Sequence, residues 1–144
     1  MRHKKFGRKL GRNHHQRQAL FKGLARSLFI SGSVNTTQAK AKAVVPLVEK
    51  ICALAQKNNL VSRRTIFSYF QNRTLVNRIN QSVNLAFKDQ HSNFTQIIPA
   101  KYRQGDNALL VRLGFTKPFA LIDPKPATKK VVKKLTKKPT KNAK

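Results

Sequence analysis

The sequence predicts an α+β fold in which helices pack on one face of a small antiparallel sheet. Four segments between residues 14 and 87 repeat apolar residues every three or four positions, which is the spacing of amphipathic helices. The pattern then changes to two extended runs, 94–98 and 108–115, separated by the polar, glycine-containing segment 101–107. Two such runs with a polar connection are typical of a β-hairpin. The helices are expected to cover one side of it, because both layers then bury their apolar faces.

The first helix is predicted over residues 14–30. Asn13 is a favourable N-cap, and Gly32 follows at a position where a residue in the left-handed conformation commonly ends a helix. The apolar stripe consists of Leu20, Phe21, Leu24 and Leu28. Residues 33–36 are then short and extended, and they are able to add a third strand to the hairpin.

The second helix is predicted from a cap at Thr36 or Thr37 to about Lys57, where two asparagines end it. Its core face consists of Val44, Leu47, Val48, Ile51, Leu54 and Ala55. Pro46 lies within this segment, and proline removes a helical hydrogen bond and clashes with the preceding turn. A kink at Pro46, or a break into two helices, is therefore expected.

Two further helices are predicted before the strands. Ser62 is expected to cap a helix that runs to about Gln71, and a fourth helix runs from about Thr74 to Phe87. The inward side chains of the third helix are Ile66, Phe67 and Phe70. Those of the fourth are Leu75, Val76, Ile79, Val83 and Phe87.

Basic residues are concentrated at the two ends of the chain. The net charge is +27, from 31 Lys and Arg against 4 Asp and Glu, and neither 1–26 nor 125–144 contains an acid. We therefore divide the chain into an extended basic arm (1–12), a globular domain (13–122) and a Lys/Pro/Thr-rich tail (123–144). Repulsion between the lysines predicts that the tail is disordered when free.

The composition argues against an enzyme. Glu49 is expected on the polar side of the second helix near Lys42 or Lys50, and the three aspartates are expected to be solvated loop residues. The single Cys52 permits no internal disulfide and is expected to pack as a small apolar residue. The histidines match no zinc-binding spacing, and no glycine-rich phosphate loop is present. No cofactor, metal or small-molecule substrate is therefore expected.

Signals for a membrane or for secretion are lacking in the sequence. The apolar runs are far shorter than a membrane span, and no apolar signal-peptide core follows the basic start. The cytoplasm is therefore the expected compartment, without a membrane partner.

The basic residues instead favour nucleic-acid binding. Cations that neutralise backbone phosphates release bound counterions, and arginine binds phosphate in a bidentate manner. The arm also contains His3 and Phe6, which are able to stack on unpaired bases. The polar side of the first helix continues the charge along the chain.

RNA is favoured over DNA as the nucleic acid. The third and fourth helices have the order of a helix-turn-helix, but the fourth offers only Arg78 as a strong base-reading cation, so it makes a poor recognition helix. A histone-like DNA-compacting protein is the main alternative, and an RNA-processing enzyme is a further one.

Short motifs run through residues 1–122. The most specific are the opening MRHKKFGRKLGR and the segment Thr36-Thr37-Gln38-Ala39-Lys40-Ala41-Lys42. They are accompanied by the shorter segments Arg17–Leu20, Leu24–Leu28, Glu49-Lys50, Arg63-Arg64 and Tyr102–Ala108. Together they resemble the bacterial large-subunit ribosomal protein seventeen family. Asn93–Gln96 departs from the Gly-Tyr-Thr-Arg segment of that family, so one basic contact expected there is absent.

The resemblance implies a structural component of the large ribosomal subunit, without catalysis, in the cytoplasm. It implies binding to large-subunit ribosomal RNA and to neighbouring large-subunit ribosomal proteins near the peptide exit region. The expected RNA-binding residues in the arm are Arg2, His3, Lys4, Lys5, Arg8, Lys9 and Arg12. Those on the first helix are Arg17, Lys22 and Arg26. Those at the start of the second helix are Thr36, Thr37, Lys40 and Lys42, because free N–H groups there help to hold phosphate. The last three are Arg63, Arg64 and Arg103.

Overall fold

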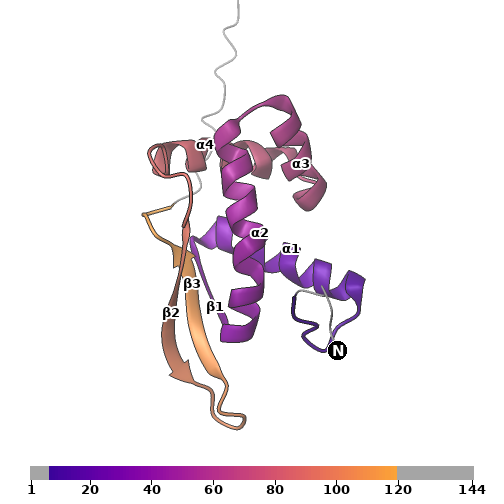
Figure 1. The fold of residues 1–144 in the computed structure, drawn as a ribbon, viewed down its shortest axis with the longest axis vertical. Helices are drawn as coiled ribbons and strands as arrows, with labels where there is room; N and C mark the ends of the chain where they lie inside the picture. Colours follow the sequence, from indigo (N-terminus) through magenta and orange to yellow (C-terminus); the bar gives the residue numbers. More distant parts are fainter. Residues whose placement is uncertain (1–6, 120–144) are drawn as a thin grey trace, which may run out of the picture.

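The computed structural model describes residues 7–119, which form four helices and three strands (Figure 1). In chain order these are α1 (His14–Ser31), β1 (Ser33–Thr37), α2 (Gln38–Lys57), α3 (Leu60–Phe70), α4 (Arg73–Ala86), β2 (Thr95–Tyr102) and β3 (Leu109–Phe115). The predicted α+β class is confirmed. The first six residues of the arm and the whole tail assigned to 123–144 lie outside the described range.

The three strands form one antiparallel sheet in the order β1-β3-β2. The third strand expected from residues 33–36 is confirmed, because β1 pairs with β3 along its whole length. β2 pairs with the other edge of β3 and extends to Tyr102, beyond the predicted end at residue 98. The register shifts between Pro99 and Lys101, a bulge that accommodates a proline with no N–H to donate to the ladder.

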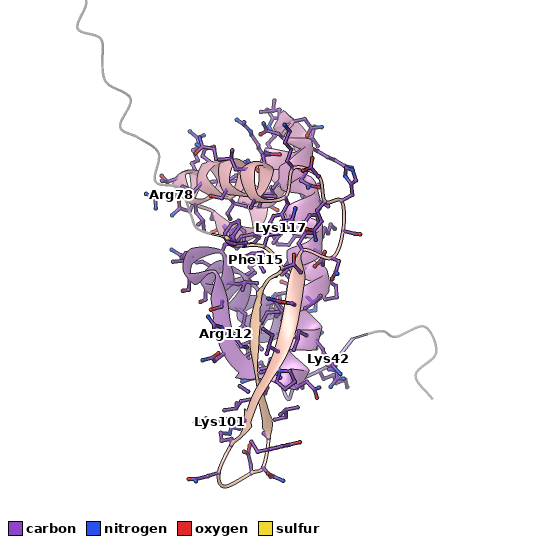
Figure 2. All side chains as sticks on the ribbon, turned by 90° about the vertical axis from the view of Figure 1, so that its left-hand side faces the viewer. Lys42, Arg78, Lys101, Arg112, Phe115 and Lys117 are labelled. Atoms are coloured by element: carbon purple, nitrogen blue, oxygen red, sulfur yellow. The ribbon has the colours of Figure 1, made fainter. Side chains whose placement is uncertain are left out.

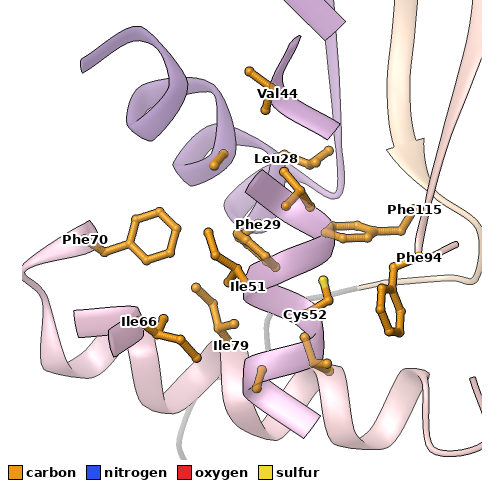
Figure 3. Packing of buried hydrophobic residues seen from close by; sticks show 14 of the residues in the cluster. Leu28, Phe29, Val44, Ile51, Cys52, Ile66, Phe70, Ile79, Phe94 and Phe115 are labelled. Atoms are coloured by element: carbon orange, nitrogen blue, oxygen red, sulfur yellow. The ribbon is translucent and has the colours of Figure 1, made fainter. Parts of the chain in front are cut away.

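α2 is the element that joins the helices to the sheet. It lies along one face of the sheet and contacts all three strands, and the other helices contact it in turn (Figure 1). Val44, Val48 and Ile51 are fully buried on its core side, as their spacing predicts. Figure 3 shows Ile51 and Cys52 in the middle of this core. Cys52 is fully buried, which confirms that it packs as a small apolar residue.

Phenylalanine rings close the end of the core where the sheet meets α1 and α4. The ring centroid of Phe115 in β3 lies 5.5 Å from that of Phe29 and 5.9 Å from that of Phe87. Phe87 in turn meets Phe94 edge to face at 5.3 Å, and Phe119 packs 4.3 Å from Phe115. Such pairs contribute about 0.5–1.5 kcal/mol beyond area burial. The cluster therefore ties the open end of the β2–β3 hairpin, where β2 begins and β3 ends, to the helices.

Pro46 does not divide α2. Of the two expected outcomes, a kink or a break into two helices, the break does not occur, because α2 is a single helix from Gln38 to Lys57; the kink stays a prediction. Proline removes the N–H that would bond the carbonyl of Lys42, four residues earlier. Both residues are exposed, so water is able to bond that carbonyl instead.

Two details of α3 also differ from the prediction. The N-cap is Asn59, whose side chain accepts a hydrogen bond from the N–H of Ser62 at 2.8 Å. The predicted cap at Ser62 is wrong, and that residue is instead 3% exposed. Phe67, predicted to point inward, is 39% exposed. The buried row runs through Ser62, Ile66 and Phe70 at intervals of four residues, which turns Phe67 toward the surface.

Candidate nucleic-acid interface

The described part of the arm, residues 7–12, forms a turn directly before α1. Gly7, Leu10 and Gly11 have positive φ angles of 98°, 54° and 62°, and the Arg12 side chain donates to the carbonyl of Leu10 at 2.8 Å. The predicted contact residues within it, Arg8, Lys9 and Arg12, are all exposed. The other predicted arm residues, Arg2, His3, Lys4 and Lys5, lie outside the described residues.

α1 carries its three predicted cations in two adjacent rows. Residues three or four apart are neighbours on a helix surface, so Gln18, Lys22 and Arg26 form one row and Arg17 and Phe21 lie in the next. Arg26 is exposed, whereas Arg17 and Lys22 are half-buried. The structure thus brings Lys22 and Arg26 together and sets Arg17 beside them. Their contact with RNA stays a prediction.

The start of α2 does not gather its four predicted residues at one point. Thr36 pairs with the buried Val111 of β3, and residues paired across strands share a face, so Thr36 lies on the side of the sheet that α2 covers. Thr37 lies on the other face and is the N-cap, without a hydrogen bond from its side chain to the first turn. Lys40 and Lys42 are two positions apart and therefore point to different sides of α2. Of the four, Thr37 has the most direct access to the first-turn N–H groups.

Arg63 and Arg64 lie far from these residues. α2 has 20 residues and is thus about 30 Å long, and α3 begins beyond its C-terminal end (Figure 1). Arg63 donates through Nε and Nη2 to Oδ1 of Asn58, at 3.2 and 2.8 Å, and Arg64 is exposed. This pair therefore forms a separate basic site at the opposite end of the molecule.

The turn of the hairpin holds an exposed ion pair. Arg103 binds Asp106 in a bidentate manner, through Nε to Oδ1 at 2.9 Å and through Nη2 to Oδ2 at 2.5 Å. The hydrogen bond from Arg103, with a further one from the N–H of Ala108, lowers the pKa of Asp106 to about 2. The same hydrogen bond raises the pKa of Arg103. The expectation of a simply solvated Asp106 omitted this partner, and Arg103 offers RNA a charge that Asp106 already offsets.

The open face of the sheet carries cations that the sequence reasoning missed. Arg112 alternates with the buried Val111 and Leu113 and is exposed, and its Nη2 donates to the hydroxyl of Ser33 at 3.1 Å. Lys101 is exposed on β2, toward the hairpin turn. Figure 2 labels Arg112 and Lys101 along this part of the sheet. The alternation of apolar and polar residues over 111–113 was the available signal.

Glu49 serves the fold and takes no part in the interface. Its Oε2 accepts a hydrogen bond from the N–H of Phe94 at 3.1 Å, and its Oε1 accepts from the N–H and the hydroxyl of Thr95 at 2.9 and 2.8 Å. The prediction of a polar-side position beside a lysine missed these three bonds. Burial raises the pKa of the Cys52 thiol well above its ordinary value, and the Glu49 carboxylate raises it further. The thiol is therefore protonated and unreactive.

Between residues 7 and 119, few features other than positive charge point to a binding site. That stretch holds no group of three His, Cys, Asp or Glu side chains placed to bind a metal ion, and none of its helices has the length and apolarity needed to cross a bilayer. It presents exposed lysines and arginines around an α+β core. These features define the class of basic proteins suited to nucleic acid.

The chain belongs to the ribosomal protein L17 family, whose model matches residues 20–116. It is similar to the large ribosomal subunit protein bL17 of Acidobacterium capsulatum, with 38% identity over 108 residues that cover 75% of this chain and 68% of the relative. The bL17 protein of Hyphomonas neptunium is 37% identical over 108 residues, 75% of this chain and 77% of the relative. That of Gemmatimonas aurantiaca is 36% identical over 113 residues, 78% of this chain and 96% of the relative.

Proposed function

We propose that the chain is a structural component of the large ribosomal subunit, in the cytoplasm, and that it binds large-subunit ribosomal RNA. Membership of the family and the names of the relatives support the ribosomal role. The observation that carries RNA binding is the charge imbalance of the described surface. Glu49 is bound to backbone N–H groups and Asp106 to Arg103, so few carboxylates compete with phosphate for the remaining cations.

The proposed mechanism is charge neutralisation with a fit of shape. Cations on the arm and on α1 neutralise backbone phosphates and release their counterions, with little direct reading of bases. The arm 1–12 threads between RNA segments. The globular domain 13–122 presents the cations of α1 to the RNA, and the tail 123–144 contributes less to RNA affinity than the arm does. Neighbouring large-subunit ribosomal proteins near the peptide exit region are the proposed protein partners. No catalytic step, cofactor or small-molecule substrate is part of the proposal.

Sucrose-gradient fractionation of a cell lysate tests this function, with the tagged full chain followed across the gradient. We expect the chain to sediment with large subunits and to stay there after DNase treatment. A chain that is found on bulk DNA, and that leaves the heavy fractions after DNase, would contradict the proposal and favour a histone-like DNA-compacting protein. Catalytic turnover that persists after removal of ribosomes would contradict it in favour of an RNA-processing enzyme.

A further inference from the structure

A hollow of about 340 Å³ opens on the surface between α1, α2 and α3. Its lining residues are Gln18, Phe21 and Lys22 of α1, Leu47 of α2, and Ser68 and Tyr69 of α3. The volume lies at the lower end of the range of small-ligand pockets, about 300–1,000 Å³. It therefore suits an occupant the size of one ring system with a short attachment.

The lining combines apolar side chains with polar groups. Phe21, Leu47 and Tyr69 pack against the buried core and are only partly covered, so the core holds their positions while one side of each stays accessible. Ser68 donates its hydroxyl hydrogen to the carbonyl of Thr65 at 2.7 Å, which leaves lone pairs of its oxygen to accept. The hollow thus offers aromatic side chains beside a hydrogen-bond acceptor.

The charge around the hollow has one sign. Lys22 is the single charged residue among the six that line it. Arg26 follows Lys22 by one turn of α1, and Arg17 precedes Phe21 by one turn. A strand of RNA that follows these cations along α1 would pass the mouth of the hollow with its phosphates.

We propose that this hollow takes one unpaired nucleobase of the RNA that α1 binds. The base stacks on the Tyr69 and Phe21 rings, and Lys22 contacts the phosphate attached to it. Unpaired bases that stack on aromatic side chains are the usual targets of RNA recognition. The inference rests on the proposed RNA-binding function and adds a base contact to it.

Tyrosine fluorescence provides a direct probe, because the chain has two tyrosines and no tryptophan. Tyr102 is exposed near the hairpin turn, so Tyr102→Phe leaves Tyr69 as the only emitter. The probe is a short single-stranded oligoadenylate, compared with an abasic oligonucleotide of equal length that keeps every phosphate. We expect the oligoadenylate to shorten the fluorescence lifetime of Tyr69 and the abasic strand to leave it unchanged, although both bind the basic surface.

Side-chain variants supply the matching affinity test. Tyr69→Leu should weaken binding of oligoadenylate at least about fivefold relative to the abasic strand, since a base stacked on an aromatic side chain contributes that much or more. Tyr69→Phe keeps the ring and should restore the affinity. Phe67→Leu, on the same helix but outside the hollow, is the matched control and should have no effect.

The possible failures of the two proposals are distinguishable. If RNA binds with its full salt dependence while the Tyr69 lifetime and the Tyr69→Leu affinity stay unchanged, the base-binding hollow is overturned and the proposed function stands. The hollow would then be open to a protein neighbour. If the chain binds neither strand and is absent from large subunits, the proposed function itself fails.

Discussion

Glu49 on α2 accepts two hydrogen bonds from Thr95 at the start of β2, one from its N–H at 2.9 Å and one from its hydroxyl at 2.8 Å. The adjacent Phe94 adds a third through its N–H. Thr95 is only 7% exposed, so water competes little for these bonds. The carboxylate therefore holds the first residues of β2 against the helix that supports the sheet.

Glu49→Gln should lower the free energy of unfolding by about 1–3 kcal/mol, because hydrogen bonds to a charged acceptor are stronger than neutral ones. Urea unfolding measures the change. Asp89→Asn makes the equivalent substitution at an exposed residue and should alter stability by less than about 0.5 kcal/mol. Equal losses from the two variants would show that the Glu49 bonds contribute nothing specific.

Asp106 should keep its charge into strong acid. Its pKa is lowered from 3.8 to about 2 by Arg103 and Ala108. The ion pair therefore stabilises the fold at pH values above the pKa that Asp106 has in the unfolded chain. This stabilisation is lost as the pH falls through the lower pKa of the folded protein. In an NMR titration, we expect the Asp106 carboxyl to titrate near pH 2 and to return toward its ordinary range in Arg103→Gln. Lys101→Gln, which removes an exposed cation two residues before Arg103, is the control. An Asp106 midpoint that does not move in Arg103→Gln contradicts the pairing.

Asn80→Leu should stabilise the fold. Asn80 is 3% exposed, and neither its amide nitrogen nor its amide oxygen has a hydrogen-bond partner among residues 7–119. An unsatisfied buried amide costs about 1–3 kcal/mol, and leucine of similar size removes that cost. Asn77→Leu, at an exposed position of the same helix, should change stability little. Thermal unfolding that places Asn80→Leu below the parent would show that the amide has a partner.

Arg112 and Arg103 should contribute differently to RNA binding. Arg112→Gln should lower affinity for a ribosomal RNA fragment and reduce the salt slope by about one, as loss of a phosphate contact does. The double variant Arg103→Gln/Asp106→Asn removes a pair of opposite charges, so it should leave affinity nearly unchanged. Filter binding across a range of salt concentrations measures both. A double variant that loses as much as Arg112→Gln would make Arg103 a direct contact.

Removing residues 2–12 should weaken RNA binding strongly. The segment carries six Lys and Arg, and at about 0.7 per phosphate contact the salt slope falls by about 4 if all six bind. Circular dichroism should show the helices intact, since α1 begins at His14. Removing residues 125–144 takes away nine lysines and should cost less affinity. Equal losses would mean that the two ends bind equally.

Much of the fold could be predicted because local periodicity carries it. The spacing of Val44, Val48 and Ile51 predicts the buried side of α2, and the apolar run 108–115 predicts the strand β3. The predicted cap at Ser62 was wrong because Asn59 caps α3 three residues earlier. The inward position of Phe67 was wrong because only the row of Ser62, Ile66 and Phe70 packs on the core. β2 extends to Tyr102 because pairing with β3 supplies its hydrogen bonds, although its last residues have no apolar alternation.

For the candidate interface, the sequence alone determined the excess of cations, their position on the arm and α1, and the resemblance to one family, because charge and motifs are local properties of the chain. Only the tertiary structure decided which cations are neighbours. It placed Thr36 and Thr37 on opposite faces, separated Arg63 from the start of α2 by the length of that helix, and paired Glu49 with Thr95, 46 residues away. Such relationships depend on how the elements pack, and packing brings together residues that no local pattern connects.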